Sequence, residues 1–451
     1  MRWQHWLVMA STAGCTTGSG SRMVDETFAL GALRRPTEDP RDTAREDAGL
    51  AGPVTRAQIL ALAVARDAGL RALVHEARAA LHAARAEGAL PPPELNAQVW
   101  NLPLARPYAL GEAGMYMVEA RQMFPAAGSR DARARAAAEE ARERVAALGA
   151  RESEVLSQAG QAYADYLHGA LEHRVHANHL GLLDAMLGAA RARFASGGPL
   201  ADVPRIESEQ ARTHRAMTRI DSELERARAA LNTLLRREAD APFGPPADLA
   251  PETVQLPLAD LLALAARARS ELGQARARIR SAAARSDAAR AESRWPTFTG
   301  ALSYWQDPML RPGVGATVAA TLPWVWGGAA ERVAEARERE LAEAASADRV
   351  TVTVRSEVAV ARARLEGLSR ELTVLRREAR PAAARAETAV RVSYVAGRGD
   401  LLAWIDAARQ VLDVETEEAD VTSAMAHAAT DLEQAVGAAL PRVAVETDAL
   451  P

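Results

Sequence analysis

Stretches of alternating apolar and polar residues occur in each half of the chain and predict β-strands. In residues 94–99 (ELNAQV) the alternation is strict, and in residues 297–304 (TFTGALSY) the larger apolar side chains fall on one parity. Successive side chains of a strand point to opposite faces, so this period of two indicates a sheet with unlike faces. Each strand is expected to approach the roughly 9–11 residues that a tilted strand needs to cross an outer membrane. With their partners, we expect strands at about 93–103, 114–124, 296–306 and 313–323.

Long amphipathic helices are predicted around these strands. Between about residues 129 and 193, apolar residues recur at the spacing of a coiled-coil seam, as at Val145, Leu148 and Val155. At 1.5 Å per residue this helix would extend about 100 Å, and two shorter helices at 57–88 and 201–237 would together match that length. The second half repeats the arrangement, with expected helices at 257–293, 328–392 and 400–437.

The two halves are copies of one unit. Residues 60–63 and residues 262–265 both read LALA, and each is followed by an Ala/Arg-rich helix, a proline and an alternating stretch that ends in Trp. Each copy has the order helix, strand, strand, long helix, glycine break, helix. We expect a first structural repeat at 54–240, a Pro-rich linker at 241–257, a second repeat at 258–440, an N-terminal linker at 16–53 and a C-terminal tail at 441–451.

The first 15 residues, MRWQHWLVMASTAGC, have the order of an export signal. A basic start and a short apolar run precede Ala13-Gly14-Cys15, which resembles the cleavage site of a bacterial lipoprotein signal. In that reading Cys15, the single cysteine, becomes the lipid-bearing first residue. The alternative is an ordinary signal peptide with an incidental cysteine. Both predict an exported protein.

Composition excludes several functional classes. The net charge is −4 and acidic and basic residues are interleaved, so no nucleic-acid surface is expected. No apolar run reaches the roughly 18 residues of a membrane-spanning helix. The sequence also has no phosphate loop, CxxC, HExxH or nucleophile elbow. We therefore expect a protein that is not an enzyme and needs no cofactor.

Four strands in a lipid bilayer would raise a problem of closure. Tyr304 and five tryptophans near the strand ends suit the aromatic girdles of a membrane barrel: Trp100, Trp295, Trp305, Trp324 and Trp326. An open sheet edge in hydrocarbon leaves unpaired backbone groups that cost several kcal/mol each. Several chains must then share one barrel. A barrel of about eight strands is filled by its own side chains, so a conducting tube needs at least three copies.

The duplicated order resembles the TolC-like outer-membrane efflux factor family over nearly the whole chain. The most specific matches are residues 322–328 (LPWVWGG), where the second strand leads into a long helix, and Asp406-Ala407-Ala408; residues 123–128 (MFPAAG) are a looser version. The resemblance implies a mainly α fold with transmembrane β-strands, long coiled-coil hairpins and four strands per chain. It further implies a trimer with a 12-strand barrel in the outer membrane, continuous with an α-helical tunnel through the periplasm.

The same resemblance implies a function. The expected protein is a passive duct for drugs or metal ions, a homotrimer whose partners are a periplasmic adaptor and an inner-membrane pump of the resistance-nodulation-division class. The alternatives are the outer-membrane channel of a type I protein secretion system, or a periplasmic coiled-coil adaptor or structural lipoprotein.

Glycine and proline mark the expected turns. Pro125, Gly128, Pro323 and Gly327 lie where strands lead into long helices. Two glycine breaks, at about 194–201 and 394–400, must turn the chain between helical arms. The resemblance places both breaks at a periplasmic tip where the adaptor docks, with these candidate residues: Phe194, Gly197, Gly198, Tyr394, Gly397 and Gly399.

Acidic and histidine side chains supply the remaining candidates. By resemblance Asp406 belongs to a ring that constricts the tunnel, with a solvated helix face as the alternative. Asp400 either contributes to that ring or caps the helix start. His173 and His176, spaced by three on the long helix, are weak metal candidates, and a solvated or interhelical role is the alternative.

Overall fold

A computed structural model describes residues 40–106, 108–247, 249–307 and 311–445. The predicted signal segment with Cys15, most of the N-terminal linker and the end of the C-terminal tail lie outside these residues. The described residues divide into two units. The sheet unit contains residues 71–148 and 270–351, and the helical unit contains residues 40–70, 149–269 and 352–445.

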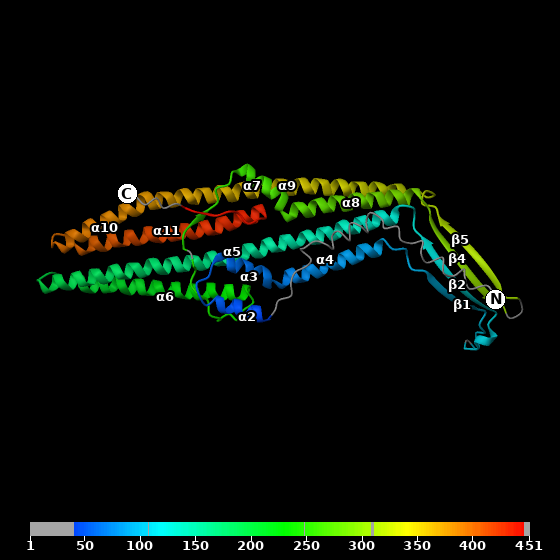
Figure 1. Ribbon diagram of the computed structural model, residues 1–451, viewed down its shortest axis with the longest axis horizontal. Helices are drawn as coiled ribbons and strands as arrows, with labels where there is room; N and C mark the ends of the chain where they lie inside the picture. Colours follow the sequence, from blue (N-terminus) through cyan, green and yellow to red (C-terminus); the bar gives the residue numbers. More distant parts are fainter. Residues whose placement is uncertain (1–39, 107, 248, 308–310, 446–451) are drawn as a thin grey trace. The chain divides into compact units, whose positions relative to one another are not determined.

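The sheet unit is built on a four-stranded antiparallel sheet (Figure 1). Its strands are β1 (Glu94–Trp100), β2 (Met115–Phe124), β4 (Thr297–Gln306) and β5 (Gly313–Thr321), in the order β1-β2-β4-β5. The central β2–β4 pair joins the two repeats, with Val118 opposite Tyr304. A short 3-10 turn, η2 (Leu110–Glu112), lies in the β1–β2 connection. This arrangement confirms the predicted four strands per chain.

Helices of the sheet unit pack closely because many contact residues are alanine. They are α4 (Ala68–Glu87), the start of α5 (Ser129–Ala195), α8 (Ser270–Arg294) and the start of α9 (Gly328–Val374). Leu81 and Ala84 of α4 pack with Ala138 and Ala141 of α5 in one buried cluster. An ion pair between Arg280 and Glu139 (Nε to Oε2, 2.9 Å) links α8 to α5.

The helical unit contains the remaining elements. They are α2 (Pro40–Gly49), α3 (Arg56–Arg66), α6 (Asp202–Leu234), α7 (Leu258–Ala268), α10 (Arg380–Val395), α11 (Leu401–Val436) and the short strand pair β3 (Glu252–Thr253) and β6 (Val443–Ala444). One core cluster includes Ile59 of α3, Tyr166 of α5 and Ile220 of α6. A second joins α5, α6, α10 and α11 around Trp404.

Two predicted helices are each interrupted once, at the same place in both repeats. The expected helix 57–88 divides at Asp67 into α3 and α4, and the expected helix 257–293 divides at Arg269 into α7 and α8. Both residues have extended backbone angles. Asp67 Oδ1 accepts a hydrogen bond from the Leu70 amide (2.7 Å), and its carboxylate also pairs with Arg151. The side chain thus satisfies an amide that the break leaves without a helical partner.

The long helix of the second repeat contains a π-helical turn. The turn, η3 (Leu375–Ala379), separates α9 from α10, and Pro381 follows it. Proline lacks an N–H group and its ring clashes with the carbonyl four residues earlier in an α-helix. A wider turn relieves that clash. The corresponding α5 of the first repeat is continuous over 67 residues.

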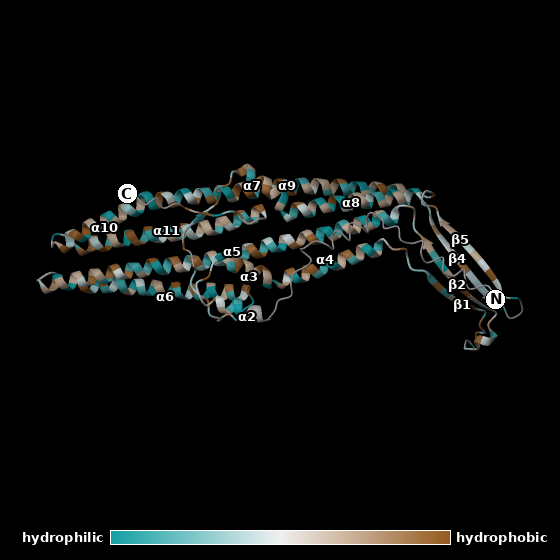
Figure 2. Cartoon of the chain, in the orientation of Figure 1, coloured by the Kyte–Doolittle hydropathy of each residue, from teal (hydrophilic) through white to brown (hydrophobic). Residues whose placement is uncertain are grey.

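A helix also occurs within the predicted N-terminal linker. Residues Pro40–Gly49 form α2, and Leu50 after it is buried in the α3–α5–α6 cluster. None of the described helices combines the length and apolarity that a bilayer-spanning helix needs. Figure 2 shows teal and brown residues mixed along the helices.

Candidate functional site

The two faces of the four-stranded sheet differ in polarity. Leu95, Ala120, Leu302 and Ala316 are register partners across all four strands and share one face. The large apolar residues of this face are exposed, for example Val314 at 76% and Val318 at 80%. Water-exposed apolar patches of this extent mark an interaction or membrane surface. The full set of exposed large apolar residues on this face is Leu95, Val99, Val118, Phe124, Phe298, Leu302, Tyr304, Val314 and Val318.

The opposite face of the sheet is more polar, although it also carries Met115, Met117, Met123, Trp100 and Trp305. Of the residues predicted for an aromatic girdle, Trp100 and Trp305 therefore lie on this face, and Tyr304 lies on the apolar face. Asn96, Glu119, Ser303 and Gly315 are partners across the four strands. Arg121 donates a hydrogen bond to Glu119 on this face (Nη2 to Oε1, 2.8 Å). Such alternation, apolar on one face and polar on the other, is typical of a barrel wall between lipid and a water-filled lumen.

Each repeat turns from strand to long helix through a glycine. Gly128 has φ of +82° and Gly327 has φ of +75°, a conformation that side chains with a Cβ disfavour. Pro125 directly follows β2, and Pro323 lies two residues after β5. In the first turn the Ser129 hydroxyl donates to the Ala126 carbonyl (2.8 Å).

The two glycine breaks have the same backbone geometry. Gly197 has φ of +94° and its N–H bonds to the Phe194 carbonyl, while Gly198 N–H reaches the Arg193 carbonyl (both 2.9 Å). Gly397 has φ of +77° and bonds to the Tyr394 carbonyl, and Arg398 N–H reaches Ser393 in the same way. This pair of hydrogen bonds is the Schellman motif that ends a helix.

Gly399 is required because of the space around it, and not because of its backbone angle. A Cβ at Gly399 would lie 2.6 Å from the Tyr394 amide nitrogen. Arg193, which belongs to the first repeat, also stabilises this break, because its Nη1 donates to the Gly399 carbonyl at 3.1 Å.

The aromatic residues at the two breaks differ in exposure. Phe194 is 45% exposed, whereas Tyr394 is 1% exposed and packs on Trp404 with ring centroids 5.3 Å apart. The Tyr394 hydroxyl donates to the buried Asp202 carboxylate (2.8 Å). Burial, reinforced by this hydrogen bond, raises the pKa of Tyr394 to about 12. Arg193 lies over the Tyr394 ring, 4.6 Å from its centroid.

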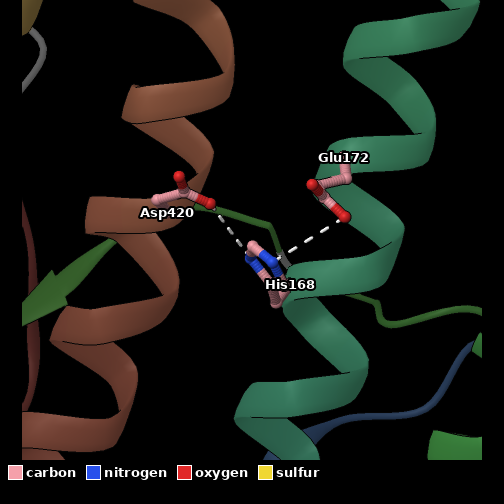
Figure 3. A group of neighbouring side chains, drawn as sticks. All are labelled: His168, Glu172 and Asp420. Carbon is pink, nitrogen blue, oxygen red and sulfur yellow. Dashed lines mark ion pairs between the residues drawn. The ribbon is translucent and has the colours of Figure 1, made fainter. Parts of the chain in front are cut away.

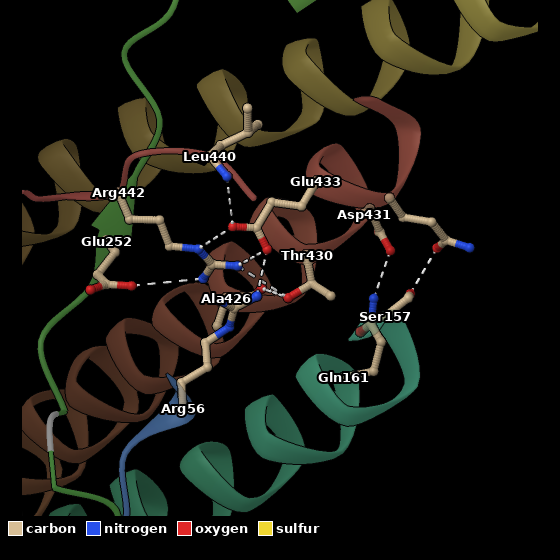
Figure 4. Close-up of polar contacts among 11 residues, drawn as sticks. Arg56, Ser157, Gln161, Glu252, Ala426, Thr430, Asp431, Glu433, Leu440 and Arg442 are labelled. Atoms are coloured by element: carbon tan, nitrogen blue, oxygen red, sulfur yellow. Dashed lines mark hydrogen bonds and ion pairs between the residues drawn. The ribbon is translucent and has the colours of Figure 1, made fainter. Parts of the chain in front are cut away.

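A buried ion network joins the end of α11 to segments before and after it (Figure 4). Glu433 accepts hydrogen bonds from Arg442 (Nη2 to Oε2, 2.9 Å) and from Arg56 (Nη2 to Oε2, 2.5 Å). Burial alone would raise the pKa of Glu433, but the hydrogen bonds and charges of the two arginines lower it below its ordinary value. Arg442 also pairs with Glu252 of β3 at 3.7 Å.

Solved structures of outer-membrane channels share this fold. The outer-membrane channel OprN matches with a TM-score of 0.69 and 16% identity, over 91% of this chain and 96% of that one. CusC matches with a TM-score of 0.71 and 17% identity, over 85% and 92%. The outer membrane protein VceC from Vibrio cholerae matches with a TM-score of 0.69 and 18% identity, over 85% and 96%. None of the curated proteins matches the chain in sequence.

A protein-family model matches part of the chain. Residues 261–438, nearly the whole second repeat, match the sequence model of the outer membrane efflux protein family. The match covers less than half of the chain and shows that this part is similar to the family. The predicted resemblance is thereby supported, and the predicted mainly α fold with long helices and four strands in one sheet is confirmed.

Asp406 lies on an exposed face of α11. Its side chain is 68% exposed, and its contact with the nearest cation, Arg409, is a loose 3.7 Å ion pair. Leu402 and Gln410, one turn to either side, are also exposed. Asp400 occupies the N-cap position of α11, but its side chain accepts no capping hydrogen bond.

The histidines of α5 are distributed around the helix. His173 forms a 3.6 Å ion pair with Asp221 of α6. Burial lowers the pKa of His176, whose Nδ1 has no hydrogen-bond partner among the described residues. The structure does not bring His173 and His176 together with a third ligand, and instead groups His168, Glu172 and Asp420. Sequence reasoning missed this group because Asp420 lies on α11, and only the i, i+4 spacing of His168 and Glu172 was visible.

Proposed function

We propose that the chain is an outer-membrane efflux channel that forms a trimeric duct, with three copies of the four-stranded sheet closed into one barrel. The observation that carries the proposal is the sheet itself. It has one exposed apolar face and one more polar face, and β1 and β5 each have one unpaired edge among the described residues. In lipid these edges must be paired. Pairing β5 of one copy with β1 of the next satisfies every edge and encloses the polar face.

Transport through such a duct needs no chemistry by the protein. Drugs or metal ions would enter from an inner-membrane pump, of the resistance-nodulation-division class, through a periplasmic adaptor. The duct would carry them across the periplasm and outer membrane.

The glycine breaks are our candidates for the end that meets the adaptor. Two observations support this. Both breaks are Schellman turns of one geometry, and apolar side chains beside them are exposed, including Phe194, Leu200 at 63% and Val395 at 68%. The buried Tyr394 would support the turn rather than contact the adaptor directly. Replacing Phe194 and Leu200 with serine should reduce binding of the cognate adaptor while leaving the oligomer intact.

Purified protein in detergent tests the trimer and the duct together. We expect the mass of three copies and, in a planar lipid bilayer, discrete channel openings. As a specific test of edge pairing, prolines at alternate positions of β5 should prevent oligomer formation, because proline has no N–H to donate to a neighbouring strand. Alanines at the same positions of β5, which keep the N–H, serve as the comparison. A monomer without channel activity would refute the proposal.

We further propose that Asp406 lines the narrowest part of the duct, with Asp400 nearby. The support for this proposal is that the Asp406 side chain is exposed in a single chain and forms no tight ion pair there. Asp406→Ala should raise conductance and weaken block by divalent cations. Asp184→Ala, at an exposed aspartate of α5, is the matched control. Unchanged conductance and unchanged cation block in Asp406→Ala would remove this assignment.

Cys15 is our candidate for a lipid anchor, on the support of the Ala-Gly-Cys sequence alone. Cells grown with radiolabelled palmitate should label the wild-type protein but not Cys15→Ser. Labelling of both, or of neither, would contradict the anchor without affecting the barrel.

A further inference from the structure

We propose that His168, Glu172 and Asp420 form a binding site for a divalent transition-metal ion such as Zn²⁺. The three side chains come from two helices, with His168 and Glu172 on α5 and Asp420 on α11 (Figure 3). One donor atom can be chosen from each residue so that all three lie within 4.8 Å of one another. The inference is independent of the proposed transport, because it concerns an ion bound between α5 and α11 and not an ion carried through the duct.

The three donor atoms are near enough to bind one ion if the exposed carboxylate moves toward it. His168 lies between the two carboxylates, with Nε2 3.8 Å from Glu172 Oε2 and Nδ1 3.7 Å from Asp420 Oδ1. These two distances end on different ring nitrogens, and one ion can bind only one of them, so the relevant spacing is the 4.8 Å within which the three donor atoms lie. Tetrahedral zinc holds nitrogen and oxygen ligands at about 2.0–2.2 Å, which puts ligand atoms roughly 3.3–3.5 Å apart, so the three side chains must close around the ion. The Asp420 side chain is 56% exposed and free to make the remaining movement.

Glu172 supplies a second, independent observation. The residue is 93% buried, from its exposed fraction of 7%, and Oε2 has no hydrogen-bond partner among the described residues. A buried carboxylate oxygen without a partner is costly. Its other oxygen, Oε1, lies 3.7 Å from Arg219, so Oε2 is the atom that faces His168. A cation bound at Oε2 would satisfy it.

The ligand set indicates which ions fit. One imidazole and two carboxylates match borderline ions such as Zn²⁺, and the two negative charges neutralise a dication. Three protein ligands leave a fourth position for water, as in open zinc sites. The absence of thiolate and thioether ligands in the group disfavours Cu⁺.

Metal binding is tested with the untagged full chain in detergent, stripped with a chelator and titrated with Zn²⁺ by calorimetry near neutral pH. We expect one saturable site per chain, and a tetrahedral visible spectrum when Co²⁺ replaces Zn²⁺. His168→Asn, Glu172→Gln and Asp420→Asn should each weaken binding by at least about tenfold, since even outer-shell changes cost about that much at a metal site. Asp420→Asn, at an exposed position, keeps the test valid if the buried Glu172→Gln destabilises the chain.

His173→Asn is the matched control. His173 and Asp221 form a histidine–carboxylate pair at a similar distance, 3.6 Å, on the same helix but without a third ligand. This variant should bind Zn²⁺ like the wild type. No saturable binding by the wild type, binding unchanged in all three site variants, or binding lost in His173→Asn would overturn the proposal. The first of these results would leave His168 as a partner in ion pairs only.

Discussion

Removing the charge of Glu433 should destabilise the helical unit strongly. Three charge-assisted hydrogen bonds reach this carboxylate, two from Arg442 and one from Arg56. The side chains of Glu433 and Arg442 are only 12% and 8% exposed. Glu433→Gln keeps the shape but turns an amide N–H₂ toward one arginine. Two cations then remain, with only the partly exposed Glu252 near them.

The magnitude follows from burial. Removing one partner of a buried ion pair lowers the free energy of unfolding by about 3–5 kcal/mol, because the remaining charge stays buried without compensation. Since glutamine retains one acceptor oxygen, we expect about 3 kcal/mol. The matched control is Glu335→Gln, in an exposed i, i+4 pair with Arg339 whose side chains are 55% and 75% exposed. Exposed pairs of this kind contribute about 0.3–0.5 kcal/mol.

Circular dichroism in increasing denaturant measures both variants against the wild type. If unfolding is irreversible, unfolding rates at a fixed temperature replace the equilibrium midpoint. A cost below about 1 kcal/mol for Glu433→Gln, or a cost equal to that of Glu335→Gln, would show that the network does not hold the α11 end as we reason.

The same network predicts acid sensitivity. Because the folded pKa of Glu433 is lowered, its stabilising contribution is complete above the unfolded value of about 4.3 and is lost as the pH falls through the folded value. Glu433→Gln should therefore flatten the acid side of the stability profile. If Glu433→Gln lost as much stability at low pH as the wild type does, the role given to Glu433 would be contradicted.

Two further predictions concern the glycine break of the second repeat. Gly399→Ala should loosen the break and increase protease cleavage there, because the added Cβ would lie 2.6 Å from the Tyr394 amide nitrogen; Gly188→Ala, where a Cβ meets nothing within 4 Å, should not. Tyr394→Phe should cost about 1–3 kcal/mol in unfolding free energy, since it leaves the buried Asp202 carboxylate without its hydrogen bond. The raised pKa of Tyr394, about 12, means that its contribution is complete below about pH 10 and is lost as the pH rises toward 12, so the phenylalanine variant should lack this alkaline loss in a pH series of melting curves. Equal alkaline loss in both proteins would contradict the role of the hydroxyl.

The strands and the turns could be predicted from the sequence because each depends on a local pattern of residues. Alternation along residues 94–99 depends only on the pleat, and Gly197 and Gly397 are required by backbone angles that few other residues adopt. The breaks at Asp67 and Arg269 were missed because the Ala/Arg-rich sequence around them favours helix throughout.

Contacts between helices could not be predicted in the same way. The seam spacing on α5 indicates that a face is buried, but not which helix covers it. The burial of Tyr394 depends on Trp404 and Asp202, and the grouping of His168 with Asp420 depends on the pairing of α5 with α11. Each joins residues whose proximity is set by packing of the whole unit.

The π-helical turn η3 changes the phase of the buried stripe along its helix. Before the turn, buried residues follow steps of three and four through Leu365, Leu372 and Leu375. Continued unchanged, these steps would reach Ala386 and Ser393. The buried residues are instead Glu387 and Tyr394, each one position later. A single extra residue in one turn thus determines that Tyr394, rather than the serine beside it, faces Trp404, and deleting one residue there would rotate the whole end of the hairpin by about 100°.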